Sequence, residues 1–420
     1  MLFLAALHIT LSFGRTAADT FAGANESVFT VEIQAVNDRS LHAQGSAFVV
    51  LGENLLITNY HVISDSILEP DLFMVVVIDA NGKHRDAKVR AVDVINDLAI
   101  LSTEESIGRP LTIRQSIPSK GTKAFSLGNP GGLGLMVVEG IYNGLSESSY
   151  VPTIHFSGAI NAGMSGGPTV DENGQVIGVN TASRRRDQLI GLLAPADRVT
   201  NLLNTFSTGL SQAPHSLKAQ IEKQIVRHLD EMTRDLLIFP IEKVVSGGFT
   251  LPAIFHDQAS CYGDLEKELG RRFLVAVRSC SLRGGIFVSQ DLQLGTITVS
   301  HRRIYGDHLS ARQVAYAQNQ LSRSDVEDSG SPVKGKTEWL CRFATVILQS
   351  GLKGVLHACR RQLSDFAFAN DHYYLFASRP KGNEGLLTEI KLKGITDVNA
   401  KKIINHFFNS ISSDSPKESS

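Results

Sequence analysis

A serine in a glycine-rich turn is the clearest chemical feature of this 420-residue chain. Ser165 follows Gly163 by two positions and is itself followed by Gly166-Gly167-Pro168. Glycine tolerates the backbone angles and close approaches that such a turn requires. Its hydroxyl could act as a nucleophile in acyl transfer, with the N–H groups of Gly163 and Ser165 binding the oxyanion. The turn alone would also fit a plain hairpin, so its meaning depends on partners elsewhere in the chain.

A histidine and an aspartate upstream supply those partners. His61 ends an apolar run that begins at Leu55, and Asp97 directly precedes the apolar run 98–101. A free hydroxyl is a weak nucleophile near neutral pH, so a base must accept its proton. A carboxylate is also needed to orient the imidazole and to stabilise the imidazolium. The sequence therefore predicts a catalytic triad of His61, Asp97 and Ser165.

Five segments between about Asn25 and Asn204 resemble the protease domain of chymotrypsin-like (trypsin-fold) serine peptidases, especially the HtrA/Deg type. They are residues 45–50, 58–62, 96–101, 127–134 and 159–168. The resemblance implies an all-β double β-barrel catalytic domain over residues 25–204. It also implies a serine endopeptidase with an acyl-enzyme mechanism and no cofactor. Met164 departs from the pattern, because HtrA-type proteins usually have Asn there and digestive enzymes have Asp. A methionine cannot receive a newly freed N-terminal ammonium, so zymogen activation of the digestive kind is not expected.

The resemblance also locates a specificity pocket. Its base is expected at Ala159 and Ile160, and its opposite wall at Gly191 and Leu192. No carboxylate is present there to pair with Arg or Lys, so we expect cleavage after small or medium aliphatic residues. Selectivity by methylene count is worth only about 1–3 kcal/mol and should be loose. The basic run 184–186 near this pocket is either a solvated hairpin tip or a site that attracts acidic substrate segments.

The overall composition is that of an ordinary globular protein of two or three domains. Hydrophobic residues make up 42% and charged residues 20%, and the formal net charge is −1. Nothing in this balance indicates nucleic acid as a partner. The histidines and cysteines show no HExxH or CxxC spacing, so we expect no metal site.

The N-terminus and the cysteines indicate an exported protein. Residues 1–18 are apolar and end in small residues, which is typical of a signal peptide, although a core or anchor segment is the alternative. The stretch is too short for a stable membrane span. All four cysteines lie beyond residue 250, which favours disulfides in an oxidising compartment, with free core thiols as the alternative. Cys341 and Cys359 flank a predicted hairpin at equal distance, which favours that pair and, by exclusion, Cys261–Cys280. A periplasmic or secreted location follows.

The second half of the chain has a different pattern. Residues 205–236 are interpreted as a linker and a connecting helix that begins after Ser216, with apolar residues at spacings of three or four. Residues 237–411 fit an α+β accessory domain, with strands near 273–277, 295–299 and 371–377 and helices near 311–321 and 399–411. No PDZ domain is recognisable in it. Residues 412–420 are polar and are expected to be disordered.

Taken together, the sequence predicts an exported serine endopeptidase that acts on protein or peptide substrates, including unfolded ones. Two alternatives remain open. One is a non-proteolytic binding or scaffold protein on a protease fold, and the other is a chaperone-like quality-control protein. A homo-oligomer is compatible with the resemblance, because HtrA-type domains often trimerise.

Overall fold

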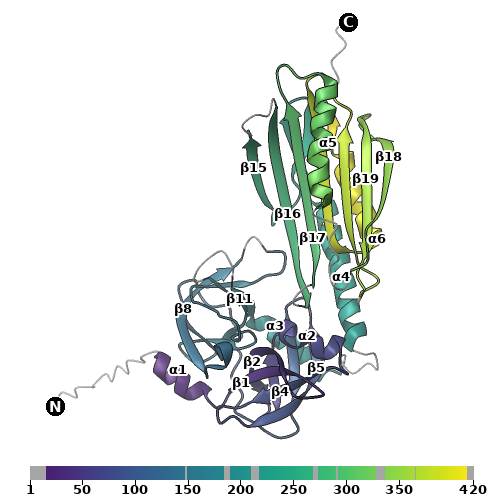
Figure 1. Cartoon of the computed structure of the whole chain (residues 1–420). Coiled ribbons are helices and arrows are strands. Elements are labelled where there is room, and N and C mark those ends of the chain that lie inside the picture. The colour runs from purple at the N-terminus through teal and green to yellow at the C-terminus, as the bar shows by residue number, and fades with distance from the viewer. Residues whose placement is uncertain are drawn as a thin grey trace, which may run out of the picture. The chain divides into compact units, whose positions relative to one another are not determined.

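The computed structural model describes residues 16–146, 149–183, 190–209, 217–267, 273–289, 292–327, 336–364 and 366–413. Contacts divide the chain into two units (Figure 1). Unit 1 comprises Met1–Ser146 and Pro152–Lys218, and unit 2 comprises Glu147–Val151 and Ala219–Ser420. The predicted basic run 184–186 lies outside the described residues, as do residues 1–15 of the predicted signal peptide.

Unit 1 contains two closed antiparallel barrels, which confirms the predicted double β-barrel. The strand order is β1-β2-β3-β6-β5-β4 in the first barrel and β10-β11-β12-β9-β8-β7 in the second. The first barrel consists of β1 (Val28–Ala35), β2 (Leu41–Leu51), β3 (Leu55–Thr58), β4 (Phe73–Ile78), β5 (His84–Asp93) and β6 (Leu98–Ser102). The second consists of β7 (Lys123–Gly128), β8 (Met136–Leu145), β9 (Ile154–Phe156), β10 (Pro168–Asp171), β11 (Val176–Ser183) and β12 (Gly191–Pro195).

One apolar cluster holds the two barrels together. It joins Phe48 and Ile57 of the first barrel to Phe125 and Val179 of the second. Helix α3 (Ala196–Ser207) packs against the same cluster through Val199. Close packing of this kind resists relative movement, so side chains at the seam between the barrels are held at defined distances.

Three short helices complete unit 1. They are α1 (Ala17–Ala24), α2 (Tyr60–Leu68) and the 3₁₀ turn η1 (Pro130–Gly132). Thr16 begins α1 through a capping box with Asp19, so the last residues of the predicted signal peptide are helical here.

Unit 2 is an α+β structure, as predicted, built on a seven-stranded antiparallel sheet in the order β15-β16-β17-β21-β20-β19-β18. Its strands are β15 (Ser260–Glu266), β16 (Leu274–Ser289), β17 (Leu292–Tyr305), β18 (Leu340–Ile347), β19 (Lys353–Gln362), β20 (Asn370–Ser378) and β21 (Glu384–Ile395). A small sheet, β13-β14-β22, contains β13 (Glu242–Ser246), β14 (Phe249–Ile254) and β22 (Ser412–Ser413). The first two residues of the predicted disordered tail are therefore ordered, because Thr250 and Phe249 pair with them.

Three helices accompany this sheet: α4 (Leu217–Ile238), α5 (Ala311–Glu327) and α6 (Asp397–Asn409). The predicted connecting helix corresponds to α4, whose periodic apolar residues are buried. The predicted start of α6 is two residues late, because the Thr396 side chain caps it by accepting from the Asn399 N–H. Leu375 packs in a cluster with Ala317 of α5, whereas its neighbour Phe376 contacts Phe408 of α6. Successive strand residues point to opposite faces, so α5 and α6 cover opposite faces of the sheet.

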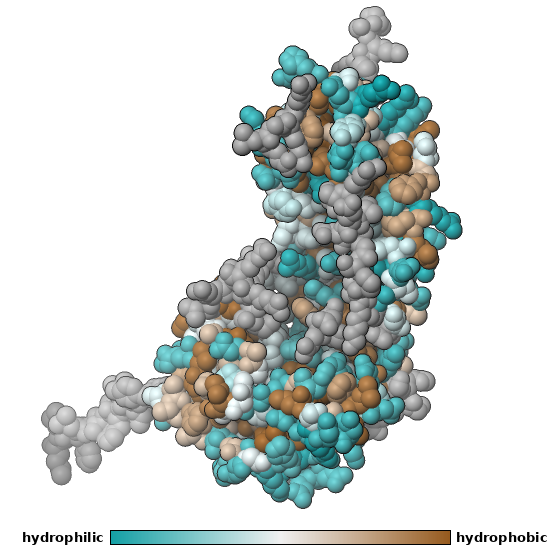
Figure 2. Space-filling model, in the orientation of Figure 1, coloured by the Kyte–Doolittle hydropathy of each residue, from teal (hydrophilic) through white to brown (hydrophobic). Residues whose placement is uncertain are grey.

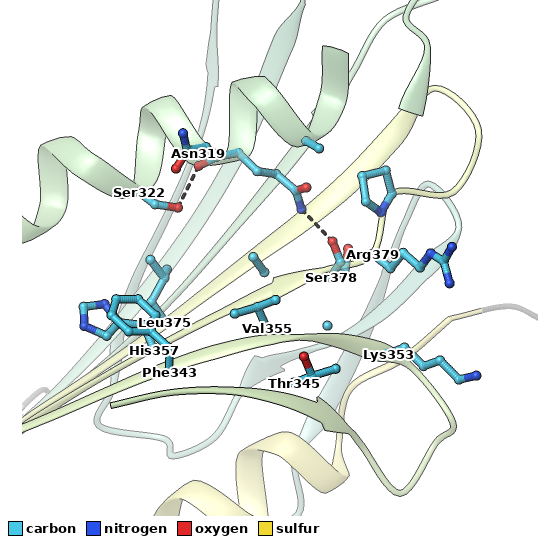
Figure 3. A pocket seen from close by; sticks show the side chains of 15 residues that line it. Asn319, Ser322, Phe343, Thr345, Lys353, Val355, His357, Leu375, Ser378 and Arg379 are labelled. Carbon is cyan, nitrogen blue, oxygen red and sulfur yellow. Dashed lines mark hydrogen bonds between the residues drawn. The ribbon is translucent and has the colours of Figure 1, made fainter. Parts of the chain in front are cut away.

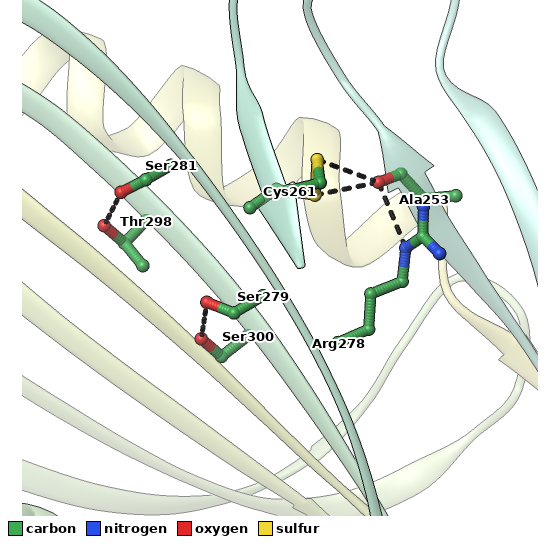
Figure 4. Close-up of a disulfide and its surroundings, with 8 residues drawn as sticks. Ala253, Cys261, Arg278, Ser279, Ser281, Thr298 and Ser300 are labelled. Carbon is green, nitrogen blue, oxygen red and sulfur yellow. Dashed lines mark hydrogen bonds between the residues drawn. A yellow bond between two sulfur atoms is a disulfide. The ribbon is translucent and has the colours of Figure 1, made fainter. Parts of the chain in front are cut away.

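Each edge strand of the large sheet is joined to its neighbour by a disulfide. Cys261 bonds Cys280 and Cys341 bonds Cys359, and each pair lies directly opposite in the strand register. Figure 4 shows the first disulfide close to the carbonyl of Ala253. All residues of β15 and all but one of β18 are exposed. Burial therefore contributes little to either edge strand, and the cross-link keeps it in the sheet.

Asp371 is a buried carboxylate of unit 2 with two cationic partners. It accepts from Lys336 Nζ at 2.8 Å and Arg361 Nε at 2.9 Å, and its other oxygen accepts from the Gly394 N–H at 3.0 Å. Burial raises the pKa of Asp371, but the two cations lower it by more, so the pKa lies below its ordinary value. Among the described residues, no helix is long and apolar enough to cross a membrane.

Candidate active site

Asp97 and His61 meet where helix α2 begins. His61 is the second residue of α2, so its backbone N–H has no partner within the helix. Asp97 Oδ1 accepts from this N–H at 2.9 Å, and Asp97 Oδ2 lies 2.7 Å from His61 Nδ1. One carboxylate thus satisfies the helix terminus and orients the imidazole. The helix dipole at this end further favours its negative charge.

An unusual backbone conformation places Asp97 there. Its φ is +56°, in the left-handed region that few non-glycine residues adopt. Asn59, just before α2, donates through Nδ2 to the Asp97 carbonyl at 2.8 Å, which holds this conformation. Strain of this kind costs about 1–3 kcal/mol and tends to occur at functional sites.

The pairing with Asp97 also sets the proton affinity of His61. Burial lowers the pKa of His61, but the charge of Asp97 and its hydrogen bond to the ring outweigh burial. The pKa of His61 therefore lies above its ordinary value. A raised pKa makes the imidazole a stronger base and stabilises the imidazolium that forms when it accepts a proton.

The Ser165 segment consists of two successive turns. The Met164 N–H donates to the Asn161 carbonyl at 3.0 Å, and the Gly167 N–H donates to the Met164 carbonyl at 3.0 Å. Gly163 has a φ of +92°, and a Cβ there would lie 2.6 Å from the Asn129 carbonyl oxygen. Only glycine fits this position. The N–H groups of Gly163 and Ser165 donate to no other described residue, so both are available to bind an oxyanion.

Met164 fixes this segment to the core of the second barrel. Its side chain is fully buried in the core of the second barrel, with Tyr142, Phe156 and Leu193 among its cluster. A charged side chain that pointed into this apolar cluster would be desolvated without a charge partner in it. At this departure from the family pattern, the chain thus has a hydrophobic side chain that packs in the barrel core.

Asn180 is a site residue that the sequence analysis did not identify. It is fully buried, and its Nδ2 donates to the Leu127 and Met164 carbonyls at 2.9 and 3.1 Å. Its Oδ1 accepts from Ser126 Oγ at 2.8 Å and Thr169 Oγ1 at 2.7 Å. All four hydrogen-bonding positions of the amide are therefore used. A polar residue inside the apolar run of β11 was the only available signal.

Ser46 is a second positioning residue that the sequence analysis missed. Its hydroxyl donates to the Gly163 carbonyl at 2.7 Å and accepts from the Asn129 N–H at 2.9 Å. The Ser46 backbone N–H also donates to the Ser165 carbonyl at 2.7 Å. Ser46 lies on β2 of the first barrel, so it joins that barrel directly to the nucleophile turn.

Ser165 Oγ itself donates to the Thr181 carbonyl at 3.1 Å. Among the described residues, no hydrogen bond joins this hydroxyl to His61. Nucleophilic attack requires the proton to be directed at the imidazole. In this structure the Ser165 hydroxyl is therefore directed at the Thr181 carbonyl, whereas the His61 ring is paired with Asp97.

The residues of the predicted specificity pocket lie together. A Cβ added to Gly191 would lie 2.5 Å from Ile160 Cδ1, so the Ile160 side chain packs over Gly191. Ile160 is 3% exposed, whereas Ala159 and Leu192 are partly exposed. Space beside Gly191 is thus filled by an apolar side chain.

One group of described residues has potential metal-ligand atoms close together, namely Cys341, His357 and Cys359. Both sulfurs belong to a disulfide and so offer no thiolate.

Part of this chain is similar to known serine proteases. Residues 45–179 match the family model of the trypsin-like peptidase domain. HhoA of Synechocystis sp., whose name describes it as a serine protease, is 33% identical over 190 residues, which cover 42% of this chain and 46% of that protein. A DegP-like protein of Brucella suis biovar 1, named as a periplasmic serine endoprotease, is 36% identical over 147 residues, or 33% of this chain and 28% of that protein. The chain thus spans less than half the length of these relatives.

Solved structures are similar to slightly less than half of the chain. The serine endoprotease from Yersinia pestis covers 46% of this chain and 68% of its own, with 24% identity and a TM-score of 0.40. Deg5 covers 45% and 92%, with 28% identity and a TM-score of 0.39. Residues 45–179 thus match a trypsin-like peptidase domain, and the chain is similar over part of its length to proteins named as HhoA and DegP-like serine proteases.

Proposed function

We propose that this protein is an exported serine endopeptidase that uses His61, Asp97 and Ser165. The observation that carries the proposal is the 2.7 Å contact between His61 Nδ1 and Asp97 Oδ2, beside a turn that presents a serine. A paired histidine and aspartate next to a serine in a glycine turn is the arrangement that acyl transfer needs.

The reaction would proceed in two halves. After Ser165 Oγ turns toward His61, it attacks the substrate carbonyl carbon while its proton passes to His61 Nε2. The N–H groups of Gly163 and Ser165 bind the resulting oxyanion. The imidazolium then gives its proton to the departing amine, which leaves an ester on Ser165. A water molecule, deprotonated by His61, then attacks this ester in the same way. The ester bond breaks, the Ser165 hydroxyl is restored, and the peptide product leaves with a new carboxylate.

Active-site labelling tests this proposal. We expect a fluorophosphonate probe to label the full-length protein, and Ser165→Ala to abolish both labelling and casein cleavage. Ser116→Ala, which removes an exposed serine outside the site, is the matched control and should label normally. A folded protein that neither labels nor cleaves would exclude the endopeptidase.

The Ile160 side chain packs over Gly191, which limits the space in the predicted specificity pocket. This packing supports cleavage after small or medium aliphatic residues. A peptide library should therefore be cut mainly after residues such as Ala and Val. Dominant cleavage after Arg or Lys would contradict this preference. We also propose export, which the two disulfides support, because they persist in oxidising compartments. Mass analysis of secreted protein would show whether residues 1–18 are removed.

One observation favours a second candidate, a binding protein on a protease fold. The Ser165 hydroxyl donates to the Thr181 carbonyl rather than to His61. If this arrangement persists with substrate bound, the protein would bind chains without cutting them. Binding of an unfolded protein by the wild type, with no labelling of Ser165, would identify this case.

A further inference from the structure

A groove lies on the face of the unit 2 sheet that carries α5. Its volume is about 890 Å³, which is within the range of ligand pockets. Figure 3 shows α5 along one side of the groove, with β18, β19 and β20 beneath it. Phe343, Val355 and Leu375 lie below the helix in this view.

The groove exists because α5 is narrower than the sheet. A helix with its side chains is about 10 Å wide, and strands lie about 4.8 Å apart, so one helix covers only two or three strands. Helix α5 contacts β17 and β21, in the middle of the sheet. The flank formed by β18 and β19 therefore lacks a covering element among the described residues.

The uncovered floor is apolar. Strand register places Phe343 opposite His357 and Thr345 opposite Val355, so these residues share a face. Phe343 is 73% exposed and Val355 is 48% exposed. Figure 2 shows apolar residues on the flank of unit 2 where β18 and β19 lie. Apolar surface that is gathered in a groove marks a binding site more often than scattered exposed residues do.

One end of the groove is positively charged. Lys353, which begins β19, and Arg379, which directly follows β20, are neighbours there, because the Arg379 N–H donates to the Lys353 carbonyl at 2.8 Å. Their side chains extend separately at this end (Figure 3). Both are exposed, and neither side chain forms a salt bridge with any described residue. The groove lining contains no Asp or Glu. The groove thus combines an apolar floor with two cations free to bind a carboxylate.

The length of the groove limits the ligand. Its helical wall runs from Ala315 to Ser322, which corresponds to about 10 Å at 1.5 Å per residue. An extended peptide rises about 3.3 Å per residue, so about three residues fit. The groove is open along this wall, where Ala315 and Asn319 are exposed. An open groove between a helix and strands suits an extended peptide better than an acyl chain, which needs to be enclosed.

We propose that this groove binds the carboxyl-terminal end of a peptide whose last residues are aliphatic. The terminal carboxylate lies between Lys353 and Arg379, and the preceding side chains pack on Val355, Leu375 and Phe343. The choice of this peptide class rests on the proposed function. An endopeptidase that cuts after aliphatic residues releases products with an aliphatic residue and a new carboxylate at their ends. Unit 2 would then retain such products, or other chains with the same ending.

Binding to the full-length Ser165→Ala protein tests this without proteolysis. The probe is a short fluorescein-labelled peptide that ends in Val-Ala-Val with a free carboxylate, and its C-terminal amide is the comparison. We expect anisotropy to show binding of the acid and at least tenfold weaker binding of the amide. Lys353→Gln and Arg379→Gln should each weaken binding of the acid about tenfold and change binding of the amide little.

Steric and charge controls complete the test. Ala315→Trp should abolish binding by filling the groove from an exposed helical position, whereas Ala311→Trp, in the exposed first turn of α5, should not. Lys401→Gln removes an exposed lysine of α6, on the opposite face, and should also leave binding unchanged. Unaltered thermal unfolding of each variant would show that it is folded.

Several results would overturn the proposal. They are an absence of peptide binding, equal binding of acid and amide, or full binding by Ala315→Trp. Tight binding of myristate in the groove without any peptide binding would instead indicate a site for amphiphiles. Fluorophosphonate labelling of the wild type decides the endopeptidase separately. Either proposal can therefore fail while the other stands.

Discussion

Replacing Asn180 by alanine should disrupt the nucleophile turn more than any other change that spares the triad. The Asn180 amide makes four hydrogen bonds inside a fully buried site, one of them to the Met164 carbonyl in the turn that holds Ser165 and one to the Leu127 carbonyl of β7. Each such bond contributes about 1 kcal/mol net. Since alanine supplies none of them, we expect the free energy of unfolding of unit 1 to fall by about 4 kcal/mol.

This loss should be visible in both stability and reactivity. For a unit of this size, about 4 kcal/mol corresponds to a fall in Tm of roughly 10 °C in calorimetry. The Met164 carbonyl loses one of its two donors, so the turn should become less ordered and fluorophosphonate labelling of Ser165 slower. Asn54→Ala is the matched control. It removes one partly buried bond, to the Thr103 carbonyl, far from the turn in the sequence.

The interpretation of Asn180 would be wrong if Asn180→Ala melted within about 2 °C of the wild type and labelled at the wild-type rate. If the variant lost stability but labelled normally once folded, Asn180 would support the barrel alone. Asn54→Ala should lose about 1 kcal/mol and keep its labelling rate.

Three further predictions concern ionisation and cross-links. Because the pKa of His61 is raised, kcat/KM should fall as pH decreases through a value above about 6.5, and Asp97→Asn should move this limb to lower pH and reduce kcat up to about 10⁴-fold. An unshifted limb in a pH–rate profile would contradict the pairing. Replacing Cys261 and Cys280 by serine opens a link between residues 19 apart and should lower the stability of unit 2 by about 3 kcal/mol. Urea unfolding followed by the single tryptophan, which lies in unit 2, measures this, and an unchanged midpoint would show that the edge strand does not need its cross-link. Asp371→Asn leaves two partly buried cations uncompensated and should cost about 3–5 kcal/mol in the same assay. Since the pKa of Asp371 is lowered, its contribution is present above about pH 4 and is lost as pH falls through the lowered value, so wild type and Asp371→Asn should converge in strong acid.

The double β-barrel of unit 1 was predicted from the resemblance of five short segments to trypsin-fold peptidases, and the triad residues were predicted from local signals. Alternating apolar strands, a glycine turn around Ser165 and short polar motifs at His61 and Asp97 are visible in the sequence without tertiary information. The cysteine pairs could also be predicted, because Cys341 and Cys359 flank a hairpin whose register places them opposite each other. The ends of elements were less accurate. The capping bond of Thr396 set the start of α6, and pairing with β14 ordered Ser412 and Ser413.

The positioning residues around Ser165 could not be predicted from the sequence. Ser46 and Asn180 lie 119 and 15 positions from Ser165 respectively, well within strands that look like ordinary barrel strands. Their roles appear only when the two barrels close and bring β2, β7 and β11 around one turn. In the same way, Met164 looked like a defect in the motif until the packing of the second barrel showed it to be an anchor.

The order of residues thus determined which side chains could do the chemistry, because nucleophile, base and orienting carboxylate each occupy a short motif with its own local signal. Only the tertiary structure decided how those side chains are held. Buried hydrogen bonds and close packing join residues from strands far apart in the chain, and no local pattern encodes which of them will meet. It also decided that unit 2 has a groove, because a gap beside a helix depends on how many strands the sheet contains and where the helix crosses them.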